Sequence, residues 1–99
     1  MQVVPQDAPC GAIIHGVDLA RALGDAETAD IRALWLKYQV LGFSGQSMTL
    51  DDLERFALTI GPFGSDPYFH PVPGHPHVAQ VRRDANETSA LFAESWHSD

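Results

Sequence analysis

The sequence is short of basic side chains: six Lys and Arg stand against thirteen Asp and Glu, a formal net charge of −7 over 99 residues. Proteins that neutralise a nucleic-acid backbone carry the opposite excess, so we expect no nucleic-acid partner. The single cysteine, Cys10, cannot form an internal disulfide. No apolar run approaches the ~18 residues of a membrane span, and residues 1–7 lack the basic and apolar regions of a signal peptide. These absences predict a cytoplasmic protein without a membrane partner.

What is present is typical of a folded protein. Hydrophobic residues make up 44% of the chain and charged residues 19%, which are the proportions of globular domains rather than of disordered chains. The length corresponds to one small domain, since domains cluster near ~100 to 150 residues. No internal repeat or linker divides it.

Two amphipathic helices are predicted. Residues 25–38 place Ile31, Leu34, Trp35 and Tyr38 at helical spacing, with Asp25 as the expected N-cap. A second helix is expected to begin at Thr49, which can cap it, and to end at Gly61-Pro62. Each predicted helix has one apolar face and must pack on another element.

Three segments have the character of strands. They are residues 11–15, 39–43 and, with imperfect alternation, 77–82. Residues 61–76 are rich in glycine and proline, which excludes regular helix there, and residues 83–89 are polar and expected to be exposed. Three or four strands are too few to close a sheet over two apolar helix faces. The pattern therefore predicts an α+β fold in which residues 1–99 form a single, incomplete domain, the N-terminal part of a larger one.

The end of the chain carries a pair of side chains with metal-binding chemistry. On an extended strand, His97 and Asp99 would point to the same face. An imidazole and a carboxylate, joined by a second imidazole, make the facial triad that holds non-haem Fe(II) and leaves positions open for substrates. This spacing also arises by chance, so the surrounding sequence has to decide.

Five blocks, in order along the chain, resemble the taurine catabolism dioxygenase (TauD/TfdA) family of Fe(II)- and 2-oxoglutarate-dependent oxygenases. Together they cover nearly the whole chain. The blocks are Gly11–Leu19, Gln39–Gln46, Thr49 with Phe56-Ala57 and Ile60-Gly61-Pro62, His70–Pro76, and Glu94-Ser95-Trp96-His97-Ser98-Asp99.

The resemblance implies a double-stranded β-helix (jelly-roll) oxygenase fold, of which this chain supplies the N-terminal part. It implies Fe(II) as the metal and 2-oxoglutarate as co-substrate, with O₂ used to hydroxylate a small, anionic organic substrate. His97 and Asp99 carry over as iron ligands. The third ligand and the Arg that pairs with 2-oxoglutarate are expected downstream of residue 99, so residues 1–99 alone should be inactive.

The resemblance also implies a substrate-binding residue, His70, in the loop that taurine-type members use on the substrate side. Its alternative is an ordinary surface histidine. Pro73 and Ala93 stand where taurine-type members have Tyr and Asn, so the resemblance does not point to taurine itself. His75 and His77 could also join His70 in a separate metal cluster, an alternative that the sequence favours less because it places no cysteine or acidic partner nearby.

A function of another class stays open at this point. The 99 residues could be a truncated, non-catalytic protein that binds a metal weakly or pairs with another subunit. The sequence does not fix the oligomeric state, and a homo-oligomer is compatible with it.

Overall fold

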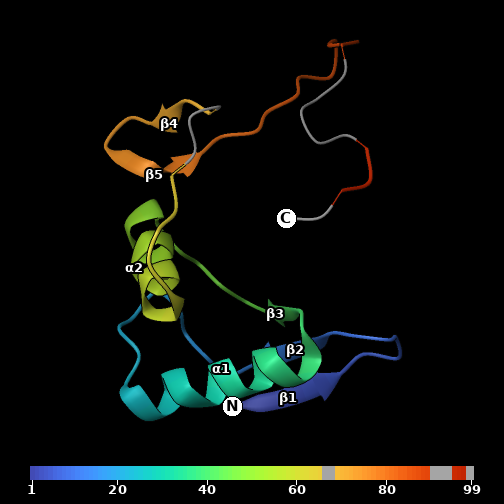
Figure 1. Ribbon diagram of the computed structural model, residues 1–99, viewed down its shortest axis with the longest axis vertical. Coiled ribbons are helices and arrows are strands. Elements are labelled where there is room, and N and C mark those ends of the chain that lie inside the picture. Colours follow the sequence, from blue (N-terminus) through green and yellow to red (C-terminus); the bar gives the residue numbers. More distant parts are fainter. Residues whose placement is uncertain (66–68, 90–94, 98–99) are drawn as a thin grey trace. The chain divides into compact units, whose positions relative to one another are not determined.

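The computed structural model describes residues 1–65, 69–89 and 95–97. The chain divides into two compact units, Met1–Ser65 and Asp66–Asp99. The first unit contains a three-stranded sheet and two helices (Figure 1). Its elements are β1 (Gln2–Pro5), β2 (Ala12–His15), α1 (Asp25–Tyr38), β3 (Leu41–Phe43) and α2 (Leu50–Ile60).

The sheet of the first unit has the order β1-β2-β3. β1 pairs with β2 antiparallel, whereas β3 pairs with β2 in parallel, with Ile14 opposite Phe43. A parallel pair needs a crossover connection, and α1 provides it. The strand predicted at 11–15 and the helix predicted at 25–38 are confirmed. The strand predicted at 39–43 is shorter, because its first two residues form a turn.

β1 was not predicted from the sequence. It contains Pro5, which cannot donate a hydrogen bond to a ladder, and all of its residues except Val3 are exposed. Proline is tolerated in a strand at the edge of a sheet, where one side makes no ladder hydrogen bonds. The strand therefore depends on its pairing with β2, which no local pattern in residues 2–5 reveals.

The core of the first unit lies between β2, α1 and the loop that joins them. The buried cluster comprises Ile14, Val17, Leu19 and Ile31, with Ile14 and Ile31 almost fully enclosed. On the opposite face of β2, the side chain of Ile13 lies over Gly42 of β3. A Cβ at Gly42 would come within 2.8 Å of Ile13 Cδ1, so any other residue there would require the Ile13 side chain to shift.

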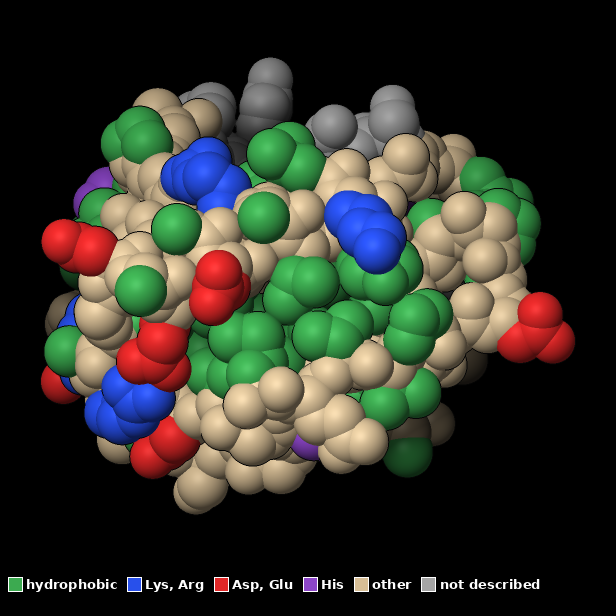
Figure 2. All heavy atoms as spheres, turned by 90° about the horizontal axis from the view of Figure 1, so that it is seen from below, with side chains coloured by type: hydrophobic (Ala, Val, Ile, Leu, Met, Phe, Trp, Pro, Cys, Tyr) green, Lys and Arg blue, Asp and Glu red, His purple; other side chains and the backbone are tan. Residues whose placement is uncertain are grey.

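α1 differs from its prediction in two ways. Its N-cap is Gly24, in extended backbone, and Asp25 is the first helical residue; the predicted Asp25 cap is wrong. Its apolar side chains are also not all buried: Ile31 is buried, but Trp35, one turn later on the same face, is 43% exposed, and Leu36, on another side, is 77% exposed. Figure 2, which views the molecule from the side where α1 and β1 lie in Figure 1, shows hydrophobic side chains gathered in the middle of that face between charged ones.

α2 agrees closely with its prediction. Thr49 caps it by accepting a hydrogen bond from the backbone N–H of Asp52, and the Asp52 carboxylate accepts from the Thr49 N–H in return. The Thr49 backbone bond, with the nearby Arg55 guanidinium, lowers the pKa of Asp52. The helix ends at Ile60, with Gly61 as its C-cap.

The second unit contains a small antiparallel hairpin of β4 (Pro71–Val72) and β5 (His75–Ala79). Its turn uses Gly74 at φ +81, a conformation that favours glycine. The strand predicted at 77–82 is therefore found, but at 75–79. Residues 83–89 are exposed as expected.

Two sheets, of three and two strands, and two helices make up the described part of the chain, which agrees with the predicted α+β composition. Neither described helix combines the length and the apolar character that crossing a membrane requires.

Gln46 connects two loops of the first unit. Its Oε1 accepts a hydrogen bond from the Leu19 N–H at 2.8 Å, and its Nε2 donates to the carbonyls of Val17 at 2.7 Å and Ser44 at 2.9 Å. The loop after β2 and the turn after β3 are thus joined through one side chain. The side-chain carboxamide bonds these backbone N–H and carbonyl groups, as a neighbouring strand's backbone would do in a regular sheet.

We predict that Gln46→Ala lowers the unfolding free energy by about 2 to 3 kcal/mol, since it leaves polar backbone groups without partners at about 1 to 3 kcal/mol each. Gln46→Glu should be at least as damaging at neutral pH, because a carboxylate oxygen would face two carbonyls. Protonation would restore a donor, so the Glu variant should regain stability as the pH falls through its raised pKa. Urea denaturation followed by circular dichroism measures these effects. Ser47→Ala, at an exposed neighbour, is the control, and a Gln46→Ala variant as stable as this control would contradict the prediction.

Candidate functional site

His97 lies in the short described stretch 95–97, where it is exposed. Its Nδ1 lies 2.8 Å from the carbonyl oxygen of Ser95. A carbonyl can only accept, so Nδ1 carries the proton and Nε2 carries the lone pair of the neutral ring. Metal-binding histidines are oriented in this way by a backbone carbonyl. Asp99 lies outside the described residues.

His70 is exposed and immediately precedes β4. His75 and His77 lie two residues apart on β5, with His75 partly buried and His77 exposed. Within the described residues, these three imidazoles do not come together as a group that could hold one metal ion. The structure therefore gives no support to the alternative of a separate three-histidine cluster.

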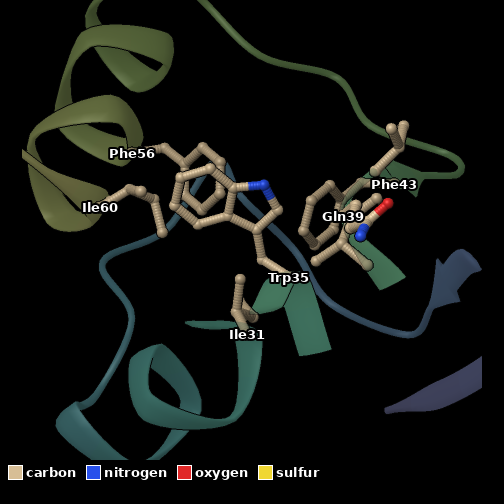
Figure 3. A pocket seen from close by; sticks show the side chains of 8 residues that line it. Ile31, Trp35, Gln39, Phe43, Phe56 and Ile60 are labelled. Atoms are coloured by element: carbon tan, nitrogen blue, oxygen red, sulfur yellow. The ribbon is translucent and has the colours of Figure 1, made fainter. Parts of the chain in front are cut away.

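The first unit brings together a set of apolar residues that the sequence did not single out as a site. They line a pocket of about 310 Å³ between α1, β3 and α2 (Figure 3). The indole of Trp35 extends from α1 toward Phe56 of α2. The lining consists of Ile31, Trp35, Gln39, Val40, Leu41, Phe43, Phe56 and Ile60.

Two contacts join the walls of this pocket. The Arg32 guanidinium, on α1, donates to the carbonyl of Ile60 at the end of α2. Carbonyls at a helix C-terminus lack partners within the helix, and α2 has no basic residue in its last turn, so Arg32 supplies the missing cation from α1. Phe43 and Phe56 meet edge to face, with ring centroids 5.7 Å apart.

Gln39, on the rim of the pocket, has a backbone conformation that is unusual for a residue with a side chain. Its φ is +68° and its ψ is −34°. The Val40 N–H donates to the Tyr38 carbonyl at 2.8 Å, which makes residues 38–40 a three-residue turn of the rare, strained kind. The turn is held at the start of β2, since the N–H groups of Gly11, just before the strand, and of Ala12, its first residue, donate to the carbonyls of Tyr38 and Val40.

A serine and a histidine also meet in the first unit. Ser44 Oγ lies 2.6 Å from His15 Nδ1, and the Ser44 N–H donates to the Ile14 carbonyl at 3.2 Å. The register of β2 with β3 places these two residues opposite one another, so the contact extends the parallel ladder by one residue. We therefore interpret the contact between Ser44 and His15 as part of the sheet rather than as a catalytic pair.

The comparisons with known proteins identify the family. The family model described as taurine catabolism dioxygenase TauD, TfdA family matches residues 2–99. The chain belongs to this family, whose members are dependent on Fe(II) and 2-oxoglutarate (alpha-ketoglutarate). The resemblance seen in the sequence is confirmed.

Three similar proteins illustrate this membership. An (S)-phenoxypropionate/alpha-ketoglutarate-dioxygenase of Sphingobium herbicidovorans is 42% identical over 60 residues, which are 61% of this chain and 21% of that protein. A solved structure from Burkholderia xenovorans, assigned as an alpha-ketoglutarate-dependent taurine dioxygenase, is 37% identical with a TM-score of 0.72, covering 83% of this chain and 31% of that one. A taurine dioxygenase structure from the same organism is 42% identical with a TM-score of 0.68, covering 76% and 27%. The matched part of this chain thus spans between a fifth and a third of these relatives.

We predict that two replacements of Gln39 differ in stability, and that this difference measures the backbone strain rather than the loss of the side chain. Gln39→Gly and Gln39→Ala remove the same polar group, but only glycine adopts positive φ without strain. The left-handed region costs other residues about 1 to 2 kcal/mol, and glycine loses about 0.5 to 1 kcal/mol more through chain entropy. The glycine variant should therefore exceed the alanine variant in unfolding free energy by about 0.5 to 1 kcal/mol. Equal stabilities in urea denaturation would contradict the assignment of strain to this turn.

Proposed function

We propose that residues 1–99 are the N-terminal portion of an Fe(II)- and 2-oxoglutarate-dependent dioxygenase that hydroxylates a small organic acid. The observation that carries this proposal is the family match over residues 2–99. The likeness of the fold to two dioxygenase structures, at 37% and 42% identity, supports it. On this proposal the chain is one incomplete domain, and the jelly-roll sheet is completed by residues that follow it.

His97 and Asp99 are the proposed iron ligands in this chain. An imidazole with a carboxylate is the donor set that suits non-haem Fe(II), and the hydrogen bond from His97 Nδ1 to Ser95 fits a ring that presents Nε2 to a metal. When bound, the iron would supply the activation of O₂ that couples decarboxylation of 2-oxoglutarate to hydroxylation of a C–H bond. The protein's part is to hold two of the ligands and to keep their orientation fixed.

Two ligands do not hold iron firmly. The third ligand and the group that binds the 2-oxoglutarate carboxylate are proposed to follow residue 99, and residues 1–99 alone to be inactive. This division of the site agrees with the part of the relatives that the chain matches, which is less than a third of their length.

The substrate class is proposed from the relatives. Phenoxypropionate carries a carboxylate and taurine a sulfonate, so both named substrates are small organic molecules with an anionic group. His70, exposed in the loop before β4, is the candidate contact for such a group, because a histidine can donate a hydrogen bond to an anion or pair with it when charged.

We predict that His97→Ala and Asp99→Ala each abolish Fe(II)-dependent formation of succinate from 2-oxoglutarate in the gene product that includes the downstream coding sequence. Loss of a ligand should reduce turnover by more than the roughly 10- to 100-fold typical of outer-shell residues. Co(II) affinity, measured by titration calorimetry, should fall in parallel. His77→Ala, the same substitution at an exposed position of β5, is the matched control and should retain turnover. Retained turnover in either ligand variant would overturn the assignment.

A further inference from the structure

We propose that the pocket between α1, β3 and α2 is the seat of apolar side chains from the part of the dioxygenase domain that follows residue 99. The inference rests on the proposed function only in taking this chain to be the N-terminal portion of a longer one. It adds an interface: a defined surface in residues 1–65 that the remainder of the protein covers.

The size and chemistry of the pocket define what fits it. Its volume of about 310 Å³ is roughly twice that of an engineered cavity of about 150 Å³ that accommodates benzene. Two aliphatic or aromatic side chains would therefore fill it. Gln39 is the sole polar residue in the lining, and the backbone groups on either side of it are already bonded to Trp35, Tyr38 and β2. An occupant would gain from burying apolar surface and would find no charged group to pair with.

The pocket is preformed, so it does not close by collapse of its own walls. The Arg32 bond to Ile60 ties α1 to α2, and the contact between Phe43 and Phe56 ties β3 to α2. Because these contacts are already made, the occupant would not have to order the walls on binding, which lowers the entropic cost of association.

The exposure of α1 indicates that a cover is required. Trp35 remains 43% exposed although its indole lies between two helices, and Leu36, on another side of the same helix, is 77% exposed. A helix that is apolar on several sides is ordinarily buried on several sides. Ile31 and Trp35 are one turn apart on the same face of α1 and both line the pocket; the first unit buries Ile31, whereas Trp35 has no full cover in the described residues.

The relatives indicate where the cover comes from. The matched segments account for 21% of the phenoxypropionate dioxygenase and 31% of the taurine-type structure, so most of each relative has no counterpart in residues 1–99. A continuation of this chain is held close to the pocket by the peptide bond itself, at an effective concentration that a separate partner would not reach. The downstream portion is therefore the occupant to which we commit.

Hydroxyl-radical footprinting with peptide mass spectrometry tests this, because it reads individual side chains whatever residues follow position 99. The protein encoded with its downstream sequence is compared with residues 1–99 alone. Modification of Trp35 and Phe56 should be several-fold slower in the longer protein. Met1, which is 51% exposed and not part of the pocket lining, should react equally in both.

A matched pair of variants confirms that protection arises in the pocket. In the longer protein, Trp35→Glu places a charge in the lining and should return Phe56 to the reactivity of the short chain. Leu36→Glu, the same change one residue away and outside the lining, should leave Phe56 protected.

Three results would overturn the inference. They are equal reactivity of Trp35 and Phe56 in the two proteins, a coding sequence that ends at codon 99, and protection that appears in residues 1–99 alone as the concentration rises, which would make a second copy the occupant. Succinate formation is measured on the same samples. Succinate formation without protection of Trp35 and Phe56 would contradict the interface but support the proposed function. Protection without succinate formation would support the interface but contradict the proposed function.

Discussion

The carboxamide of Gln46 is the contact on which the arrangement of the first unit depends. It accepts from the loop that leads into α1 and donates both to that loop and to the turn that leads into α2. Neither loop has a regular backbone partner at this point, and three bonds from a single side chain fix both. The starting positions of the two helices, and therefore the spacing of the pocket between them, follow from this tie.

A second set of contacts acts at the other ends of the helices. The strained turn at Gln39 brings the chain from α1 into β3, and the N–H groups that begin β2 hold it. Arg32 joins the middle of α1 to the last carbonyl of α2. These contacts bond backbone groups beside the pocket, and its apolar lining is left uncovered in the described residues. A surface with this character is suited to receive apolar side chains.

The sequence predicts those elements whose causes are local. Helix α2 is read correctly from Thr49 and the Gly61-Pro62 pair, because its capping box and its stop both lie within a few residues of its ends. Asp25 misleads for the same reason: it has the right chemistry for a cap, but Gly24 holds the extended backbone that the N-cap position requires. Apolar spacing likewise locates α1 but does not reveal that Trp35 stays exposed beside a pocket.

Features held by distant contacts are not predictable in this way. Two of the three partners of Gln46 are 27 and 29 residues away in the sequence, and β1 depends on β2, with which it pairs. The pocket is formed by three elements whose side chains are ordinary core residues when read one by one. For the proposed iron ligands, the sequence is more informative than the structure. His97 and Asp99 are proposed from motif and family, and the structure adds the orientation of one imidazole.

The central claim is that these 99 residues form the N-terminal part of a longer Fe(II)- and 2-oxoglutarate-dependent dioxygenase. The most direct measurement is the intact mass of the protein from its native source, together with the coding sequence beyond codon 99. We expect a mass several times the 10.8 kDa of this chain, with a later His and Arg in the added sequence. A native protein of 10.8 kDa would contradict it.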